Sequence, residues 1–310
     1  MNNMKIGFLQ LGQIGDMVLC TPAFAEIKKK YPDAELCVVS GRSNAVVLKG
    51  NPNVKKIIRL VKTPSGLLKF LLRLRSIKFD YWIDHKNHYS TESRWIAKYV
   101  NAKTKISFTQ KNYNNGVNKF FTDIVFDALQ CLDISKPEEP VLPDLYLNNE
   151  VRELAEQTLM NNGKKNILIN VSASSEKRLY SAENWDKVIA QIDMDKANVY
   201  INAMPAEKET VLFLYNKYVD LQVLPPLHLM EVAAIIEKSD LIITPDTSIV
   251  HIAAAFRKKI IALHNDDGAN FEKFATNNPN AIKIKVDGGS YLNQIPPEMI
   301  IENINKLLIS

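Results

Sequence analysis

The stretch "LQLGQIGDMVLCTPA", residues 9–23, decides how the first part of this chain is expected to fold. An apolar run ends at Gly12, a second glycine stands at residue 15, and Asp16 opens another apolar run. A strand that turns through glycine into a helix gives this pattern. At such a turn Asp16 can serve in two ways. It can be a simple helix N-cap, or a base presented to a site at the end of the strand.

Along the rest of the chain, apolar strand-like runs alternate with helical patterns. Before residue 110, strands are expected at 5–11, 35–40, 55–61, 81–85 and 103–108, and helices at 16–31, with Pro32 just past its end, 65–78 and 90–100. After residue 165, strands are expected at 166–172, 198–204, 240–246 and 259–265, and helices at 181–192, 206–218, 228–239, 247–256 and 296–310. Strands that are apolar along their length and alternate with helices indicate parallel sheets covered on both faces.

The stretch "SKPEEPVLPDLYLNN" separates these two series. Its three prolines cannot continue a helix, so it is interpreted as a linker. The 310 residues allow two ordinary domains, although one large domain has a similar length. We predict an α/β protein of two Rossmann-like, doubly wound domains, 1–143 and 144–310, facing a central cleft. The terminal helix is a candidate to pack back on the first domain.

Composition excludes several classes of protein. The chain is 46% hydrophobic and 24% charged, with a net charge of +5, which permits an anionic partner without requiring one. Cys20, Cys37 and Cys131 are unclustered and the histidines lack metal-site spacing, which indicates reduced, buried thiols in a cytosolic protein and no metal site. The first residues lack the h-region and cleavage site expected of a signal peptide, and no apolar run reaches about 18 residues, so any membrane contact is expected to be peripheral.

A dinucleotide-binding oxidoreductase is the rival from another class. The Rossmann fingerprint needs G-x-G-x-x-G and an acidic residue near the end of the second strand. The chain has only Gly12-Gln13-Ile14-Gly15, and its second strand ends in "VVSGRSN" without an acid. Arg42 would suit a 2′-phosphate, which is the one feature that supports NAD(P) binding.

The stretch 240–264, "DLIITPDTSIVHIAAAFRKKIIALH", contains a candidate anion site. A strand runs into Asp246, Thr247 and Ser248, and a helix of small residues follows. Amides at a helix start bind anions, and the two hydroxyls add donors. His251 stands on the first turn of this helix. The plainer interpretation is an ordinary N-cap followed by a core histidine.

Three separated segments carry a family resemblance: "LGQIGDMVLCTPAF", "INVSASSEKRLYSAENW" and "DTSIVHIAAAF". Together, and in this order and spacing, they resemble glycosyltransferase family 9, the ADP-heptose:lipopolysaccharide heptosyltransferases. The first resembles the family's Gly-Asp and Thr-Pro loop, the second its phosphate loop, and the third its Asp-Thr-Gly-x-x-His-x-Ala-Ala motif. The resemblance implies a GT-B fold with the donor nucleotide on the C-terminal domain and the acceptor on the N-terminal one. It also implies inversion at the anomeric carbon and no metal.

The resemblance further implies site residues. Asp16 matches the catalytic base, and Arg178 the basic residue beside the leaving diphosphate. Lys177 is a neighbouring candidate, but counting back from Trp185 places Arg178 at the family's position. The implied donor residues are Ser172, Ser174, Ser175, Glu207 (for the ribose), Asp246, Thr247, Ser248 and His251. The implied acceptor residues are Gly12, Gln13, Gly15, His85 and Lys86. The plainer alternatives are a solvated turn at "SSEKR" and a surface glutamate at residue 207.

Three departures from the family pattern leave the acceptor and the exact sugar open. Tyr180-Ser181 replaces the usual Trp-Pro, Ser248 replaces a glycine, and "DHKNH" at 84–88 replaces Asp-x-Gln-Gly.

Residues 49–86 are strongly basic. Only Asp80 and Asp84 oppose Lys49, Lys55, Lys56, Arg59, Lys62, Lys69, Arg73, Arg75, Lys78 and Lys86. Such a segment suits an anionic lipid A–Kdo acceptor or an anionic membrane face. A solvated helix face is the plain alternative, and no interleaved aromatic platform supports nucleic acid.

The sequence therefore predicts a cytoplasmic, peripherally inner-membrane-associated, inverting glycosyltransferase that needs no cofactor. It is expected to move heptose from ADP-heptose to a lipopolysaccharide inner-core acceptor. The alternatives are an NAD(P)-binding oxidoreductase, a GT-B enzyme that uses another nucleotide sugar, and a catalytically silent GT-B binding protein.

Overall fold

The computed structural model describes residues 3–86, 90–107, 119–138, 140–265, 269–286 and 291–309. The chain divides into two compact units, Met1–Tyr146 and Leu147–Ser310. Four expectations fall partly outside the described residues: positions 87 and 88 of "DHKNH", residue 108 of the strand expected at 103–108, residue 139 of the linker, and residue 310 of the helix expected at 296–310. No helix among the described residues has the length and apolar character to cross a bilayer.

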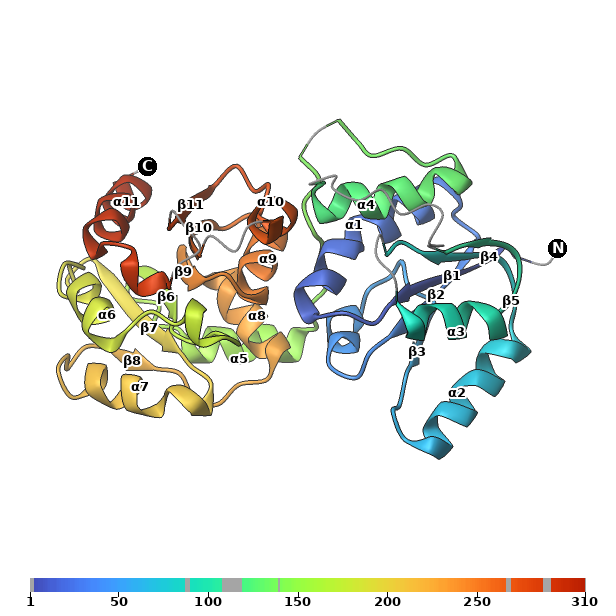
Figure 1. The fold of residues 1–310 in the computed structure, drawn as a ribbon. Coiled ribbons are helices and arrows are strands. Elements are labelled where there is room, and N and C mark those ends of the chain that lie inside the picture. Colours follow the sequence, from blue (N-terminus) through green and yellow to red (C-terminus); the bar gives the residue numbers. More distant parts are fainter. Residues whose placement is uncertain are drawn as a thin grey trace. The chain divides into compact units, whose positions relative to one another are not determined.

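The first unit has a five-stranded parallel sheet in the order β3-β2-β1-β4-β5 (Figure 1). Its strands are β1 (Lys5–Gln10), β2 (Glu35–Ser40), β3 (Lys56–Arg59), β4 (Lys78–Asp84) and β5 (Asn101–Ile106). Its helices are α1 (Ile14–Lys30), α2 (Pro64–Ser76), α3 (Thr91–Tyr99) and α4 (Phe121–Leu129). Successive side chains of a strand point to opposite faces. Accordingly Phe8 contacts Phe24 of α1, whereas Leu9 joins the core beneath α2 and α3.

The second unit has a six-stranded parallel sheet in the order β11-β10-β9-β6-β7-β8. Its strands are β6 (Lys165–Asn170), β7 (Ala197–Asn202), β8 (Gln222–Val223), β9 (Leu241–Pro245), β10 (Lys259–His264) and β11 (Ala281–Lys285). Its helices are α5 (Asn149–Thr158), α6 (Ala182–Ile189), α7 (Lys208–Tyr215), α8 (Leu229–Lys238), α9 (Ser248–Ala255), α10 (Ala269–Phe274) and α11 (Pro297–Ile309). The terminal helix α11 contacts α6, β10 and β11 of this same unit.

Both sheets confirm the predicted α/β class. In each, the strand order reverses beside the unit's first strand, between β1 and β4 and between β6 and β9. Open α/β sheets bind ligands outside the carboxyl ends of their strands at such reversals. The two reversals therefore indicate where functional side chains are to be sought.

The three cysteines agree with the prediction of reduced thiols, but only two of them agree with the prediction of burial. All three cysteines are free, and Cys20 and Cys37 are buried. Cys131 is only half-buried, because it stands on the short turn that follows α4.

Candidate functional site

Asp16 lies in the first turn of α1, at the carboxyl end of β1. The helix begins at Ile14, two residues earlier than predicted, and Gln13 occupies the N-cap position. The backbone N–H of Gln13 donates to Asp16 Oδ2 at 3.0 Å, and the Gln13 side chain accepts from the backbone of Asp16. This reciprocal pair is a capping box. The interpretation of Asp16 as a simple N-cap is therefore wrong, because it is the third helical residue.

Gly12 allows the carboxylate of Asp16 to lie against the turn. A Cβ at residue 12 would overlap Asp16 Oδ2 and stand 2.9 Å from Gln10 Oε1. The Gly12 N–H donates to that same Gln10 oxygen at 2.7 Å. From the other side, Asn44 Nδ2 donates to the carbonyls of Gln10 and Gly12 at 3.1 and 2.8 Å. The turn that carries Asp16 is thus fixed by two buried amides that the sequence did not single out.

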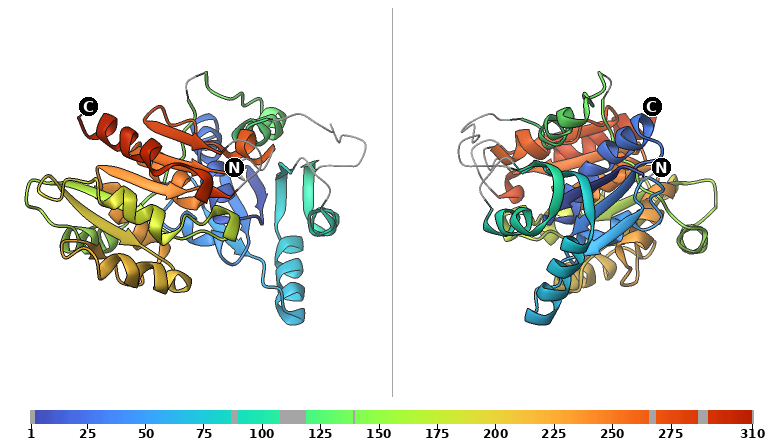
Figure 2. Two further views of the ribbon diagram at one scale, coloured as in Figure 1. Left: turned by 60° about the vertical axis from the view of Figure 1, so that its left-hand side comes forward. Right: turned by 90° about the vertical axis from the view of Figure 1, so that its right-hand side faces the viewer.

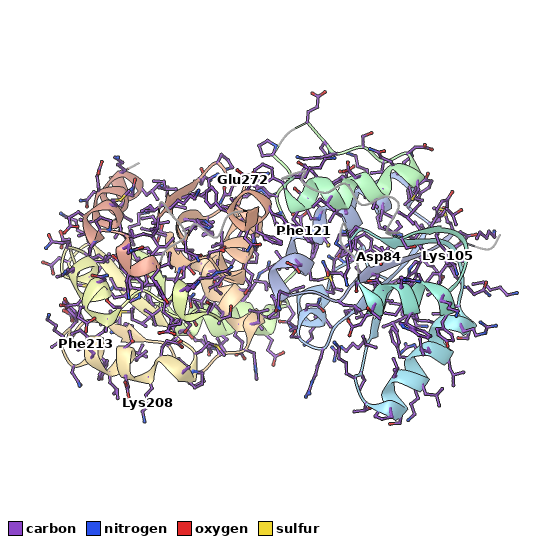
Figure 3. All side chains as sticks on the ribbon, viewed as in Figure 1. Asp84, Lys105, Phe121, Lys208, Phe213 and Glu272 are labelled. Carbon is purple, nitrogen blue, oxygen red and sulfur yellow. The ribbon has the colours of Figure 1, made fainter. Side chains whose placement is uncertain are left out.

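His85 is buried beside Gln10, one of the residues that fix this turn. Its side chain is 4% exposed, stacks on Phe8 and meets Phe121, labelled in Figure 3, edge to face. Its Nε2 lies 3.3 Å from Gln10 Nε2. Burial of this kind favours a supporting role for His85 over direct contact with an acceptor. Lys86 is half-buried, and its Nζ donates to Ser90 Oγ at 3.3 Å.

In the second unit, the loops after β6 and β7 bring Ser172 and Glu207 together. Ser172 Oγ donates to Glu207 Oε2 at 2.9 Å and accepts from the backbone N–H of Met204 at 2.6 Å. Asn170 Nδ2 donates to the Ser172 carbonyl at 3.0 Å, and Asn202 Nδ2 donates to Asn170 Oδ1 at 2.9 Å. The Glu207 carboxylate is therefore fixed by Ser172 in the segment between β7 and α7, which disfavours the surface-glutamate interpretation. Ser174 and Ser175 are exposed on the same loop.

Arg178 is held against the end of β9. Its Nη1 lies 3.4 Å from Asp246 Oδ2 and donates to the Asp246 carbonyl at 3.2 Å. Asp246 Oδ1 lies 3.6 Å from His264 Nδ1 at the end of β10. Lys177, by contrast, is exposed. The carboxylate of Asp246 thus orients the guanidinium of Arg178, and His264 is a member of this cluster that sequence reasoning missed.

The start of α9 adds hydroxyl and amide groups. Thr247 is its N-cap: Oγ1 accepts from the Ile249 N–H at 3.3 Å and lies 3.4 Å from Thr244 Oγ1. Ser248 is the first helical residue and is half-buried. A helix start carries partial positive charge and attracts anions.

His251 is buried behind this helix start and is neutral near pH 7. Its side chain is 5% exposed, and its Nδ1 has no hydrogen-bond partner among the described residues. Burial lowers the pKa of His251 from 6.5 to about 4, while nearby Asp246 opposes that shift. Positive charge for an anion is therefore supplied here by Arg178 and the helix start, not by His251.

The neutral state of His251 makes stability depend on pH. Because the folded pKa lies below the unfolded one, its contribution is fully present above about pH 6.5 and is lost as the pH falls toward 4. A shift of this size corresponds to about 3 kcal/mol. Urea unfolding should show that His251→Gln loses less stability than the wild type between pH 7 and pH 4. An identical pH dependence in the two proteins would contradict the neutral, buried state.

Four of the missed polar residues share one sequence feature. Gln10, Asn170, Asn202 and His264 are each the last residue of an otherwise mostly apolar strand. A polar side chain at the carboxyl end of a buried parallel strand points to the ligand edge of the sheet. In the described part of the chain, no group of three or more His, Cys, Asp or Glu side chains is arranged to hold a metal ion.

Comparison with known proteins connects this geometry to a family. The model described as "Glycosyltransferase family 9 (heptosyltransferase)" matches residues 67–287. The lipopolysaccharide core heptosyltransferase OpsX of Haemophilus influenzae is 24% identical over 273 residues, which cover 83% of this chain and 77% of that protein.

Two solved structures resemble the fold. The family 9 glycosyltransferase of Veillonella parvula has a TM-score of 0.83 at 17% identity, over 99% of this chain and 97% of that one. The Escherichia coli heptosyltransferase WaaC with ADP has a TM-score of 0.80 at 14% identity, over 98% of this chain and 100% of that one. These likenesses confirm the predicted GT-B fold.

Proposed function

Because this chain belongs to glycosyltransferase family 9, we propose that it moves heptose from ADP-heptose to a lipopolysaccharide inner-core acceptor of the Kdo- or heptose-lipid A type. The chain is a glycosyltransferase. The observation that carries the proposed donor is the Arg178–Asp246 pair at the end of β9, beside the start of α9. A fixed guanidinium next to a helix start suits a diphosphate.

The donor is assigned to the predicted C-terminal domain, residues 144–310. Arg178, the start of α9 at Thr247 and Ser248, and the exposed hydroxyls of Ser174 and Ser175 hold the diphosphate. The ribose hydroxyls meet the Ser172–Glu207 pair, since a carboxylate accepts two hydroxyl hydrogen bonds well. Asp246 contributes by orienting Arg178, and His251 contributes as a neutral, buried side chain of α9.

The acceptor is assigned to residues 1–143, around the turn at Gly12, Gln13 and Gly15, with Lys86 close to the end of β4 and His85 as a support. Its hydroxyl oxygen attacks the anomeric carbon as the bond from that carbon to the diphosphate oxygen breaks. The Asp16 carboxylate takes the hydroxyl proton. The negative charge that develops on the departing ADP is stabilised by Arg178 and the α9 amides. Attack opposite the leaving group inverts the anomeric centre.

The NAD(P)-binding alternative is not favoured. β2 ends at Ser40 and is followed by Gly41 and Arg42, so no acid stands where a ribose would need one. Titration calorimetry tests the choice: ADP should bind with one site per chain, and NADH should not bind. Saturable NADH binding without ADP binding would reject the proposed donor.

We expect transfer to be independent of divalent metal. Arg178 and helix amides neutralise the diphosphate in the proposed mechanism, so no cation is needed to stabilise the leaving group. Transfer rates measured in EDTA should match those in its absence. Loss of activity in EDTA that magnesium or manganese restores would overturn this mechanism.

The proposed acceptor is carried by a lipid, so the proposed location is the cytoplasmic face of the inner membrane, with peripheral contact. The rival that remains is a GT-B enzyme using another nucleotide sugar, because Ser248 and "DHKNH" depart from the family pattern.

A further inference from the structure

Helix α2 is anchored by few residues and leaves several leucines in solvent. Of its thirteen residues only Phe70 and Leu74 are buried. Leu68 and Leu72 are 60% and 59% exposed, and Leu67 is also exposed. Leu68 and Leu72 are one helical turn apart, so they share a face of the helix. Figures 1 and 2 show α2 extending away from the sheet of its own unit.

Helix α3, which contacts α2, exposes aromatic side chains. Trp95 is 55% exposed, Tyr99 is exposed as well, and their rings stack with centroids 6.3 Å apart. Only Ser93 and Ile96 of this helix are buried. Tryptophan and tyrosine are the side chains that favour the interface between water and lipid.

The charge on these two helices is mainly positive. α2 carries Lys69, Arg73 and Arg75 and no acidic residue. α3 adds Arg94 and Lys98, and its one acid, Glu92, pairs with Lys62 at 2.7 Å. Lys98 Nζ lies 5.6 Å from the centre of the Trp95 ring. Long cationic side chains beside apolar ones can reach phosphates while the apolar groups enter a lipid layer.

A second exposed apolar set, on α7, shows what distinguishes α2. Leu212, Phe213 and Tyr215 are exposed there, and Figure 3 labels Lys208 and Phe213 on this helix. This helix also carries acidic residues: Glu207 is its N-cap and Glu209 lies in its first turn. Exposed apolar side chains alone are ordinary on a protein surface. Their combination with an acid-free basic helix is what complements an anionic bilayer.

We propose that the α2–α3 surface, defined by Leu67, Leu68, Leu72, Trp95 and Tyr99 with Lys69, Arg73, Arg75 and Lys98, docks the protein onto an anionic lipid bilayer. Leu68 and Leu72 enter the boundary between headgroups and acyl chains, and the lysines and arginines contact lipid phosphates. The inference rests on the proposed function in that a lipid-borne acceptor gives the docking its purpose. The docking itself is testable without any substrate.

The chain carries its own probe for this test. It has three tryptophans, and Trp82 and Trp185 are 0% exposed. A change in tryptophan emission on adding vesicles therefore reports Trp95. Vesicles of phosphatidylcholine with phosphatidylglycerol should pellet the wild type and shift its emission to shorter wavelength. Vesicles of phosphatidylcholine alone should do neither. Equal binding to both vesicles, or binding without a shift, would contradict the proposed surface.

Matched variants distinguish binding through this surface from non-specific binding through any exposed apolar side chains. Leu68→Ser with Leu72→Ser should weaken vesicle binding at least about tenfold, because two apolar side chains no longer enter the lipid. Arg73→Glu with Arg75→Glu should abolish the preference for phosphatidylglycerol. The control, Leu212→Ser with Phe213→Ser on α7, should bind as the wild type does. Wild-type binding by the leucine variant would overturn the proposal, as would equal loss in the α7 control.

A separate assay distinguishes failure of the docking from failure of the proposed function. With a detergent-dispersed acceptor, the leucine variant should transfer sugar at the wild-type rate, since no bilayer is involved. If wild-type protein binds vesicles but transfers nothing, the proposed function fails and the docking stands. If the leucine variant transfers sugar more slowly than the wild type with the dispersed acceptor, by as much as with an acceptor in a bilayer, those leucines serve the reaction and the docking role is rejected.

Discussion

Replacing Asp16 by asparagine is expected to slow glycosyl transfer by about 10²–10⁴-fold, the range typical of a lost general base. Asparagine retains a side-chain oxygen that can accept the Gln13 N–H, which Asp16 Oδ2 now accepts at 3.0 Å. The capping of α1 is therefore largely kept. Asparagine cannot take a proton from a hydroxyl. The loss should thus appear in the rate of transfer, with the melting temperature and ADP affinity close to those of the wild type.

A second capping box provides the matched control for Asp16. In α8, the His228 N–H donates to Glu231 Oε2 at 2.6 Å. Glu231→Gln makes the same carboxylate-to-amide change in a cap and should leave transfer unchanged. Gly12→Ala should reproduce the loss without removing the carboxylate, because its Cβ would displace Asp16. If Asp16→Asn turns over at nearly the wild-type rate, Asp16 is only a capping residue.

Arg178→Ala is expected to weaken ADP-heptose binding by about 10–100-fold, since charge-assisted hydrogen bonds contribute about 1.5–3 kcal/mol. Two effects act in the same direction. The contact with the diphosphate is lost, and the Asp246 carboxylate, now 3.4 Å from the Arg178 Nη1, is left without that cation near an anionic ligand. Titration calorimetry with ADP-heptose measures the affinity, and initial rates measure the effect on transfer.

The structure supplies two comparisons for Arg178. Lys177→Ala, at an exposed neighbour, should bind nearly as the wild type does. Adding Asp246→Asn to Arg178→Ala should recover part of the lost affinity, because it removes the repelling charge. Equal losses for Lys177→Ala and Arg178→Ala would assign the diphosphate to the loop as a whole. Unchanged affinity in Arg178→Ala would remove that residue from the site.

Much of the fold is predictable because six of its strands, β1, β2, β6, β7, β9 and β10, are buried along most of their length. Residues 35–40 form β2 as predicted. The helices predicted to start at residues 90 and 181 are α3 and α6, and Ser90 and Ser181 are their N-caps. The prediction did not include α4, α5, α10, β8 or β11. α5 buries only Ala155, and β11 buries only Ile284, so neither has a strong apolar pattern. Weakly buried elements are placed by tertiary packing, which local periodicity does not record.

The candidate site was less predictable than the fold. Motif spacing singled out Asp16, Arg178 and Glu207, which the structure places in the segments that follow β1, β6 and β7. It could not find Gln10 or His264, because the importance of Gln10 depends on neighbours 34 and 75 residues away and that of His264 on Asp246, which follows the adjacent strand β9. Nor could it distinguish an N-cap from the third residue of a capping box at Asp16. That difference depends on where the first helical hydrogen bond forms, which is decided by Gln13.

Mass spectrometry of a transfer reaction tests the central claim most directly. Purified protein is incubated with a Kdo-bearing lipid A acceptor and, in separate reactions, with ADP-heptose, an ADP-hexose and a UDP-sugar. The account predicts that the acceptor gains the mass of one heptose residue with ADP-heptose only, together with one equivalent of ADP. An unchanged acceptor with ADP-heptose, or a gain of mass from one of the other donors alone, would contradict it.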